Sequence, residues 1–379
     1  MEDTYKEIFT ENESEDLVDQ KKLTGKRFYE AKTYNIIGAS QQARGQFKSA
    51  MKNFKLAIEI RPDYAEAHNN IGILHHNKGN LILALKSFKT AIKLEPDHPE
   101  FNHNMATLLY DTSDYKTAIK FFKKNNSSDS QTDLLKCFYK LGKPDSFYNQ
   151  VDFLLKRGDN NATMGRYISR AETKYGIKRP NPFCQNPLEY VLQTNILDLC
   201  DFKNIFIKGS DEILNNKLIS HNNIEIVKNG IKTAGNLFSL ETKETRQIKN
   251  IIHLEIEKYW SLFKNSNEGL IRERPKKYRV SGWILSLMNG GSVQPHMHKQ
   301  GWVSGSIYIN VPPKVKADSG NLVVCLDDAT NKLSNNQNLK SLDVRTGSLC
   351  LFPSSLPHYT VPFEGQKNRI VLGFDIIPK

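Results

Sequence analysis

The chain has 379 residues, which is enough for two domains that each bury an apolar core without disulfide bonds. Its formal charge is +12, from 53 basic and 41 acidic residues, but the basic residues form no dense run, so we expect no nucleic-acid binding. The five cysteines contain no CxxC pair, which excludes a zinc ribbon and a disulfide framework: Cys137, Cys184, Cys200, Cys325 and Cys350.

Residues 1–30 are predicted to form a charged helical segment. Its first residues, Met1 to Lys6, are acidic and lack the apolar stretch of a secretory signal. No apolar run in the chain approaches the roughly 18 to 20 residues that span a bilayer. We therefore expect a cytoplasmic protein that makes no contact with a membrane.

A 34-residue repeat follows. Equivalent positions lie 34 residues apart: Ile37 and Ile71, Gly38 and Gly72, Ala50 and Ala84, Phe54 and Phe88, Ala57 and Ala91, Pro62 and Pro96. A third copy keeps Met105, Ala106, Ala118 and Phe122, and the pattern is lost at Asn125. This period and these residue types resemble tetratricopeptide (TPR) repeats, which stack helix pairs into a solenoid.

The small residues of the repeat predict close helix packing. Gly38 and Gly72 would let the two helices of a repeat approach, while Phe54 and Phe88 would fill the gap to the next pair. A weaker helical pattern over residues 133–156 would cap the array, so we assign residues 31–165 to TPR repeats with degenerate capping helices. The inner face of TPR arrays binds peptides, so the resemblance implies a protein or peptide partner.

Prolines mark the next boundary. Pro180, Pro182 and Pro187 interrupt the helical periodicity, and we assign residues 166–190 to a linker. A helix is predicted over residues 243–264, where apolar residues recur at helical spacing. Strands are predicted over residues 278–288, 302–311, 321–326, 348–352 and 369–377. Residues 191–379 would then form a jelly roll, a double-stranded β-helix with flanking helices, and the fold class is α+β multidomain.

The predicted strands carry a possible metal site. His296 and His298 are two residues apart, so on a strand both imidazoles project from the same face. His358 lies at the end of a later strand between prolines, and Arg369 begins the last strand. This order of residues resembles the double-stranded β-helix oxygenases that use Fe(II) and 2-oxoglutarate. The resemblance implies that His296 and His358 bind iron and that Arg369 binds the distal carboxylate of 2-oxoglutarate.

A closer likeness is to a bacterial and phage branch of such oxygenases, some of which are fused to TPR repeats. The shared pieces are Trp283, His296 and His298, Ser304 to Tyr308, Ser319 to Leu322, Phe352 to Ser354, and His358, with Thr233 to Phe238 before them. The likeness covers residues from near Asn181 to the end of the chain.

Two positions depart from the usual pattern of the family. His298 stands where most members carry a carboxylate. We favour His298 as the third iron ligand; alternatives are Asp318 or Asp327 from a neighbouring loop, or a water or halide. Val371 replaces the serine or threonine that many relatives carry two residues after the arginine. Tyr278, Ser304 and Tyr308 are the candidates to supply that hydroxyl group to 2-oxoglutarate.

The resemblance therefore implies a dioxygenase that uses Fe(II), dioxygen and 2-oxoglutarate, with ascorbate as a stimulating additive, to hydroxylate a protein or peptide substrate recruited by the TPR repeats. Two alternatives stay open. One is a TPR interaction protein with a degenerate, non-catalytic jelly roll. The other is a three-histidine dioxygenase of the cupin type that does not use 2-oxoglutarate, and Arg369 would then have no cosubstrate to bind.

Overall fold

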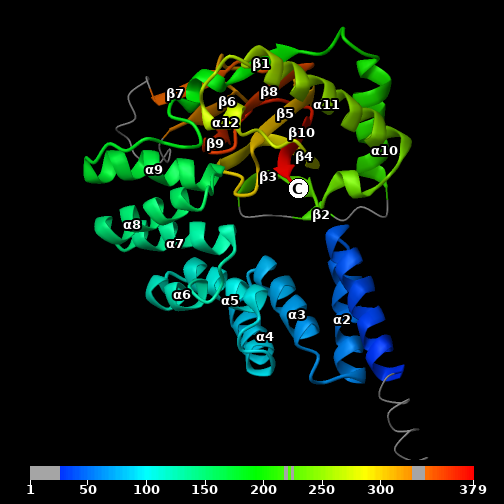
Figure 1. The fold of residues 1–379 in the computed structure, drawn as a ribbon. Helices are drawn as coiled ribbons and strands as arrows, with labels where there is room; N and C mark the ends of the chain where they lie inside the picture. Colours follow the sequence, from blue (N-terminus) through cyan, green and yellow to red (C-terminus); the bar gives the residue numbers. More distant parts are fainter. Residues whose placement is uncertain (1–25, 217–220, 223–225, 327–337) are drawn as a thin grey trace, which may run out of the picture. The chain divides into compact units, whose positions relative to one another are not determined.

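The computed structural model describes residues 26–216, 221–222, 226–326 and 338–379 of the chain (Figure 1). Two compact units are present, one ending at Asn126 and the other formed mainly by Ser127–Lys379. Helical repeats followed by an antiparallel β-sheet confirm the predicted α+β fold class. None of the described helices combines the length and apolar character needed to cross a membrane.

The first unit is an array of paired helices. After a helix over residues 26–43 come α2 (Phe47–Ile60), α3 (Ala65–Asn77), α4 (Leu81–Leu94), α5 (Pro99–Asp111) and α6 (Tyr115–Phe122). The repeat positions pack as the sequence predicts: a Cβ on Gly38 would lie 2.6 Å from the ring of Phe54, and one on Gly72 would lie 2.6 Å from the ring of Phe88. Each glycine therefore accommodates the buried phenylalanine of its own repeat.

Three further helices belong to the second unit: α7 (Ser128–Lys140), α8 (Pro144–Lys156) and α9 (Ala162–Tyr175). The segment 166–190, expected as a linker, thus begins inside α9. Ile168 and Ala171 of α9 are buried, and the helix ends at Gly176, which has a φ of +70°. The prolines lie beyond this cap, so they follow the end of the helix and do not mark the boundary between the two units.

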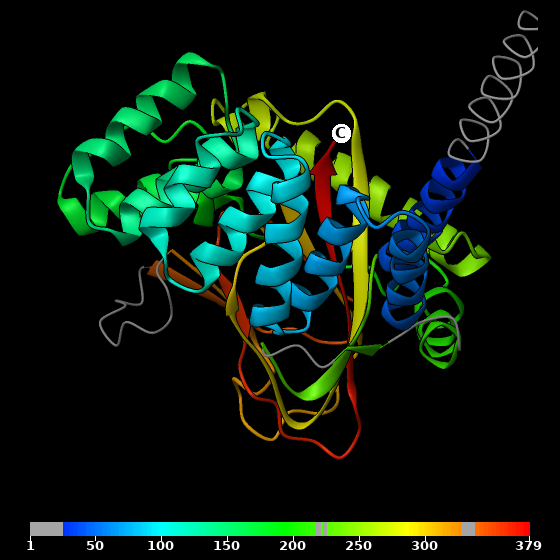
Figure 2. The same ribbon diagram turned by 90° about the horizontal axis from the view of Figure 1, so that it is seen from below.

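A single ten-stranded antiparallel sheet wraps into a nearly closed, barrel-like sandwich. Its main path is β1-β8-β5-β10-β4-β9-β6-β7, with β3 on β4 and β2 on β3. The strands are β1 (Leu192–Asn195), β2 (His221–Asn222), β3 (Val227–Thr233), β4 (Tyr278–His296), β5 (Val303–Asn310), β6 (Leu322–Cys325), β7 (Leu339–Leu342), β8 (Ser348–Pro353), β9 (His358–Thr360) and β10 (Arg369–Pro378). Figures 1 and 2 show β4 in yellow and β10 in red side by side.

Short helical segments flank these strands: η1 (Pro187–Tyr190), η2 (Lys203–Lys208), α10 (Gly209–Asn215), η3 (Leu237–Ser239), α11 (Lys243–Leu262) and α12 (Gly269–Arg272). Ile248, Ile252 and Ile256 of α11 pack in one core with Ile284 of β4 and Leu372 of β10. This helix covers the outer face of the sheet. Side chains alternate between faces along a strand, so the neighbours of Ile284 and Leu372 point into the sandwich.

Strand β4 is longer than the predicted strand 278–288. Its first half pairs with β10, and beyond Gly290, which has a φ of +73°, it pairs with β9. The Asn-Gly-Gly sequence reads as a turn, but here a glycine in the left-handed region bends a continuing strand. Beyond the bend the strand pairs with β9, so His296 lies opposite His358.

Candidate metal centre and cosubstrate pocket

Three imidazoles meet inside the sandwich. His296 ends β4 and pairs in register with His358, the first residue of β9, while His298 follows two residues after His296. One ligand nitrogen from each ring can be chosen so that all three lie within 4.8 Å of one another. Among the described residues, this is the group of histidine, cysteine or acidic side chains arranged to hold a metal ion.

The hydrogen bonds of these imidazoles fix which nitrogen is free. Nδ1 of His296 lies 2.8 Å from the Gln294 carbonyl oxygen, and Nδ1 of His358 lies 3.3 Å from the Leu356 carbonyl oxygen. A carbonyl oxygen only accepts, so each Nδ1 carries the proton and each Nε2 has a free lone pair. Nε2 of His296 lies 3.1 Å from Nε2 of His298. Two lone pairs this close fit a shared metal ion, and the set would suit Fe(II).

Burial keeps these imidazoles neutral. Burial, with a smaller contribution from the neighbouring His298, lowers the pKa of His296 to about 4. Burial also holds the pKa of His358 well below its usual range, with additional contributions from His296, His298 and the buried Arg166 of α9. Neutral imidazole is the metal-binding form, so near pH 7 little proton release would accompany metal binding at these two residues.

His298 has a different kind of partner. Its Nδ1 lies 2.6 Å from Oδ1 of Asp375, on β10. Ser304 donates to the same carboxylate oxygen at 2.7 Å, and its hydroxyl also contacts Ser354 at 2.8 Å. Asp375 was not expected as a site residue. The period-two spacing from Arg369 could have identified it, because residues 369, 371, 373 and 375 share one face of the last strand.

Arg369 is fully buried in the same pocket as the three histidines. Its Nη2 donates to the Gly320 carbonyl oxygen at 2.8 Å, and its guanidinium lies 4.9 Å from the ring centre of Tyr308. Its Nε has no hydrogen-bond partner in the described structure, and no carboxylate there pairs with it. Burial lowers the pKa of Arg369. A buried cation with a free donor fits the carboxylate of 2-oxoglutarate, which would supply the missing anion.

The structure separates the three candidate hydroxyl donors. Tyr308 lines the pocket beside Val371, its partner in the β10–β5 register. Ser304 is buried against Asp375 and His298, and so contacts a histidine rather than the arginine end of the pocket.

Tyr278 is a wrong prediction. It pairs with Pro378, nine residues along β10 from Arg369, which is about 30 Å on an extended strand. Its hydroxyl contacts Nδ1 of His253 on α11 at 2.9 Å, outside the pocket.

The alternative third ligands are also separated from the histidines. Asp318 is exposed in the turn before β6 and is not part of the histidine group. Asp327 lies outside the described residues. His298 is therefore the side chain that the described structure places in the third position.

Lys232 is an unexpected neighbour of the site. It lies on β3 in register with Leu285 of β4, and its Nζ is 4.0 Å from the ring centre of Trp283, whose ring lies 5.0 Å from that of His298. Burial lowers the pKa of Lys232 to about 8, and Asp375 partly opposes this shift. A lysine on a strand of alternating polarity is expected to be exposed, so the sequence did not identify Lys232 as a neighbour of the site.

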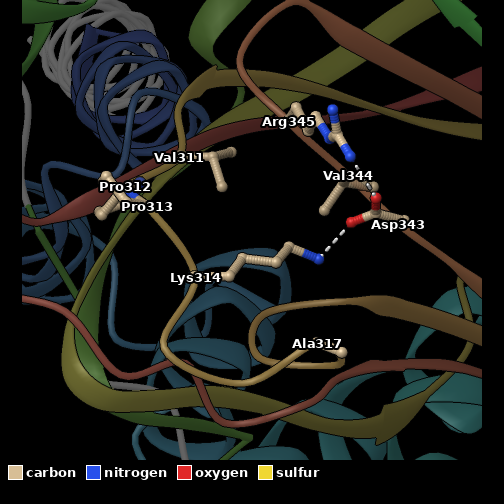
Figure 3. A pocket seen from close by; sticks show the side chains of 8 residues that line it. All are labelled: Val311, Pro312, Pro313, Lys314, Ala317, Asp343, Val344 and Arg345. Carbon is tan, nitrogen blue, oxygen red and sulfur yellow. Dashed lines mark hydrogen bonds and ion pairs between the residues drawn. The ribbon is translucent and has the colours of Figure 1, made fainter.

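A separate hollow of about 540 Å³ lies between the loop after β5 and the β7–β8 connection (Figure 3). Lys314 and Arg345 point toward Asp343 across it, with ion pairs of 2.5 and 3.2 Å. Its remaining lining is apolar: Val311, Pro312, Pro313, Ala317 and Val344. Both cations pair with the single carboxylate of Asp343, and none of the three histidines lines this hollow.

Comparison with known families agrees with this arrangement. Residues 281–375 match the family described as "Putative 2OG-Fe(II) oxygenase", residues 42–79 match "TPR repeat" and residues 65–98 match "Tetratricopeptide repeat". TPR repeats and an oxygenase-type domain thus occur in one chain, as the motifs predicted. No curated protein matches the chain.

Solved structures resemble part of the chain. The Pseudomonas aeruginosa pilF structure is 18% identical, covers 40% of this chain and 71% of its own, and has a TM-score of 0.37. A MamA structure is 17% identical, covers 38% and 82%, and has a TM-score of 0.35. A Thermobaculum terrenum O-GlcNAc transferase mutant is 18% identical, covers 34% and 26%, and has a TM-score of 0.33. These likenesses are too weak to inform function.

Proposed function

We propose that this protein is an Fe(II)- and 2-oxoglutarate-dependent dioxygenase that hydroxylates a protein or peptide substrate recruited by its TPR repeats. One observation carries the proposal: three imidazoles with free Nε2 atoms share a buried pocket with an arginine that has no anionic partner in the described structure. The match of residues 281–375 to the oxygenase family supports the same reading.

Each residue has a distinct task in this proposal. His296, His298 and His358 would hold the metal, and Arg369 would orient 2-oxoglutarate through its distal carboxylate, with the Tyr308 hydroxyl beside it. When bound, Fe(II) would let dioxygen oxidise both the substrate and 2-oxoglutarate: one oxygen atom enters a C–H bond of the substrate, and the other enters succinate as carbon dioxide is released. The apolar walls, including Leu285 and Phe352, exclude water from the pocket.

Arg369 favours a 2-oxoglutarate enzyme over a three-histidine dioxygenase that lacks this cosubstrate. Burial of an unpaired guanidinium is costly, and a metal site alone would not require it. The recruitment of substrate rests on the general role of TPR repeats in protein–protein contacts. Amide side chains link successive repeats at a constant spacing, Asn70 to Asn35 at 2.9 Å and Asn104 to Asn69 at 3.0 Å. Asn69 is buried, so the half-buried Asn35, Asn70 and Asn104 are the amides that would present polar groups to a peptide.

A cytoplasmic location is part of this proposal. All five cysteines are free thiols, which suits a reducing compartment.

The test is succinate formation. Purified protein with Fe(II), ascorbate and 2-oxoglutarate should release succinate even without substrate, by uncoupled turnover. The variants His296→Ala and Arg369→Ala should lose this activity, while Lys316→Ala, on an exposed side chain outside the pocket, should retain it. Unchanged turnover in either pocket variant would contradict the proposal. Metal analysis of anaerobically purified protein separates it from a non-catalytic jelly roll, which would hold no iron.

A further inference from the structure

The three imidazoles differ in the group that accepts their Nδ1 proton. Main-chain carbonyl oxygens accept from His296 and His358, whereas a carboxylate, that of Asp375, accepts from His298. His298 is also the residue that stands where the related oxygenases carry a carboxylate ligand. The negative charge missing from that position is therefore present one hydrogen bond farther from the metal.

Apart from the contact with His298, the surroundings of Asp375 indicate no other role for its carboxylate. Its side chain is 9% exposed, and in the described structure it contacts Nδ1 of His298 and the hydroxyl of Ser304. The site is tightly packed: a Cβ on Gly301 would lie 2.4 Å from Oγ of Ser354 and 3.2 Å from Oδ1 of Asp375. A buried carboxylate is costly unless a cation balances it. Lys232 acts on Asp375 only at longer range, since no salt bridge joins them in the described structure.

We propose that Asp375 is a positioning residue that fixes the tautomer of His298 and supplies, through it, the charge that a carboxylate ligand would otherwise bring to the metal. The hydrogen bond holds the proton on Nδ1, so Nε2 faces the metal as a lone-pair donor. The carboxylate also makes the imidazole a stronger donor to a divalent cation. This inference rests on the proposed metal site and deepens it.

Metal affinity tests the inference without any turnover. Mn(II) serves as the probe, and its free concentration is read from its electron paramagnetic resonance signal. The loss of a hydrogen-bond partner of a ligand histidine typically weakens metal binding about 10- to 100-fold, so Asp375→Asn should raise the dissociation constant by that factor. Asp318→Asn makes the same chemical change at an exposed position and should leave the dissociation constant unchanged.

A double-mutant cycle separates this role from a merely structural one. In His298→Asp the carboxylate is itself the ligand, so Asp375→Asn should then change Mn(II) affinity by less than about threefold. Equal losses in both backgrounds would mean that Asp375 only stabilises the fold, and no loss in the His298 background would mean that it has no effect on the metal. Either result overturns the inference and leaves the proposed function intact. Failure of the unaltered protein to bind Mn(II) at all would instead overturn both.

Discussion

At the scale of single residues, the last strand carries two buried charged side chains, Arg369 and Asp375, with different surroundings. Arg369, at one end of the strand, has a buried Nε–H without a hydrogen-bond acceptor, whereas Asp375, six residues farther along, already accepts a hydrogen bond from Nδ1 of His298. Because β10 is extended, the two lie about 20 Å apart along the strand with their side chains on the same face. In the proposed function, one strand would thus carry both the residue that binds the cosubstrate and the residue that supports the metal site.

The Tyr308 hydroxyl is expected to contribute to 2-oxoglutarate binding. It lies beside Val371, where many relatives carry a hydroxyl, and accepts a hydrogen bond from Ser306 at 3.3 Å. Tyr308→Phe should weaken 2-oxoglutarate binding to the Mn(II)-loaded protein by about 2- to 10-fold, since one hydrogen bond contributes about 0.5 to 1.5 kcal/mol. Anaerobic calorimetry measures this. Tyr278→Phe is the matched control and should bind normally, and equal effects of the two changes would refute the assignment.

Lys232 should destabilise the folded protein at neutral pH. Its folded pKa of about 8 is below the usual 10.5, so the unfolded chain holds the proton more strongly. The penalty is complete below pH 8 and disappears as the pH rises from 8 to above 10.5. Lys232→Met should therefore raise the free energy of unfolding by about 1 to 3 kcal/mol at pH 7, with a smaller gain at pH 10. Denaturant unfolding at both pH values measures it.

The control for that change lies on the same strand. Lys228 is exposed on β3, so Lys228→Met should leave the free energy of unfolding within about 0.5 kcal/mol at either pH. A gain from Lys232→Met that is independent of pH would show that packing against Trp283, rather than charge burial, is responsible.

The sequence predicted the three histidines that the structure brings together, because their chemistry is local. Two histidines at a spacing of two, a third at a strand end and an arginine on the next strand are visible in the chain itself. Lys232 and the misplaced Tyr278 depend instead on register: which residues of β3, β4 and β10 stand opposite one another decides which share the pocket. A single sequence does not specify that pairing.

At the scale of elements, the helix predictions were most accurate where a regular spacing of residues in the sequence fixed which positions are buried. The residues of the 34-residue repeat pack as expected, and the predicted helix 243–264 is α11. Strand β4 shows the opposite case. Its Asn-Gly-Gly sequence indicates a turn, yet the strand continues to His296 because Gly290 adopts a left-handed conformation within it. The strands β1, β3, β7 and β9 were missed because they are short or lack alternating polarity.

The repeat packing gives a prediction for the first unit. Phe88 is fully buried against Gly72, so Phe88→Ala should lower the free energy of unfolding of this unit by about 3 to 5 kcal/mol. Urea unfolding followed by circular dichroism measures the change. Ile82→Ala, on the same helix at a side chain that is 84% exposed, should change it by less than about 0.5 kcal/mol. Similar losses for both would mean that Phe88 does not fill a repeat interface.

At the scale of the whole molecule, helices α7 to α9 are part of the same unit as the β-sheet. Asp133 of α7 is buried and forms an ion pair with Lys299, the residue after His298. Phe183, after α9, is buried with its ring 5.0 Å from that of Trp302. These contacts join the last helices of the array to the loop that carries the paired histidines.

A fragment that starts before α7 should therefore keep the metal site, whereas one that starts at the expected domain boundary should not. Residues 127–379 should unfold cooperatively and bind Mn(II), because Asp133, Phe183 and their partners are retained. Residues 191–379 should aggregate or unfold at a much lower temperature, because Trp302 would lose the ring that buries it. Calorimetry of both fragments measures this, and equal melting temperatures would show that α7 to α9 are dispensable.

The chain passes between the two units more than once, because Ala43–Gln46 belong to the second unit while the residues on either side of them belong to the first. In the proposed function, a peptide held by the repeats would reach the pocket at an effective concentration that depends on these connections. Glycine-serine insertions after Asn126 should then slow hydroxylation of captured substrates, while a free peptide that bypasses the repeats would react as before.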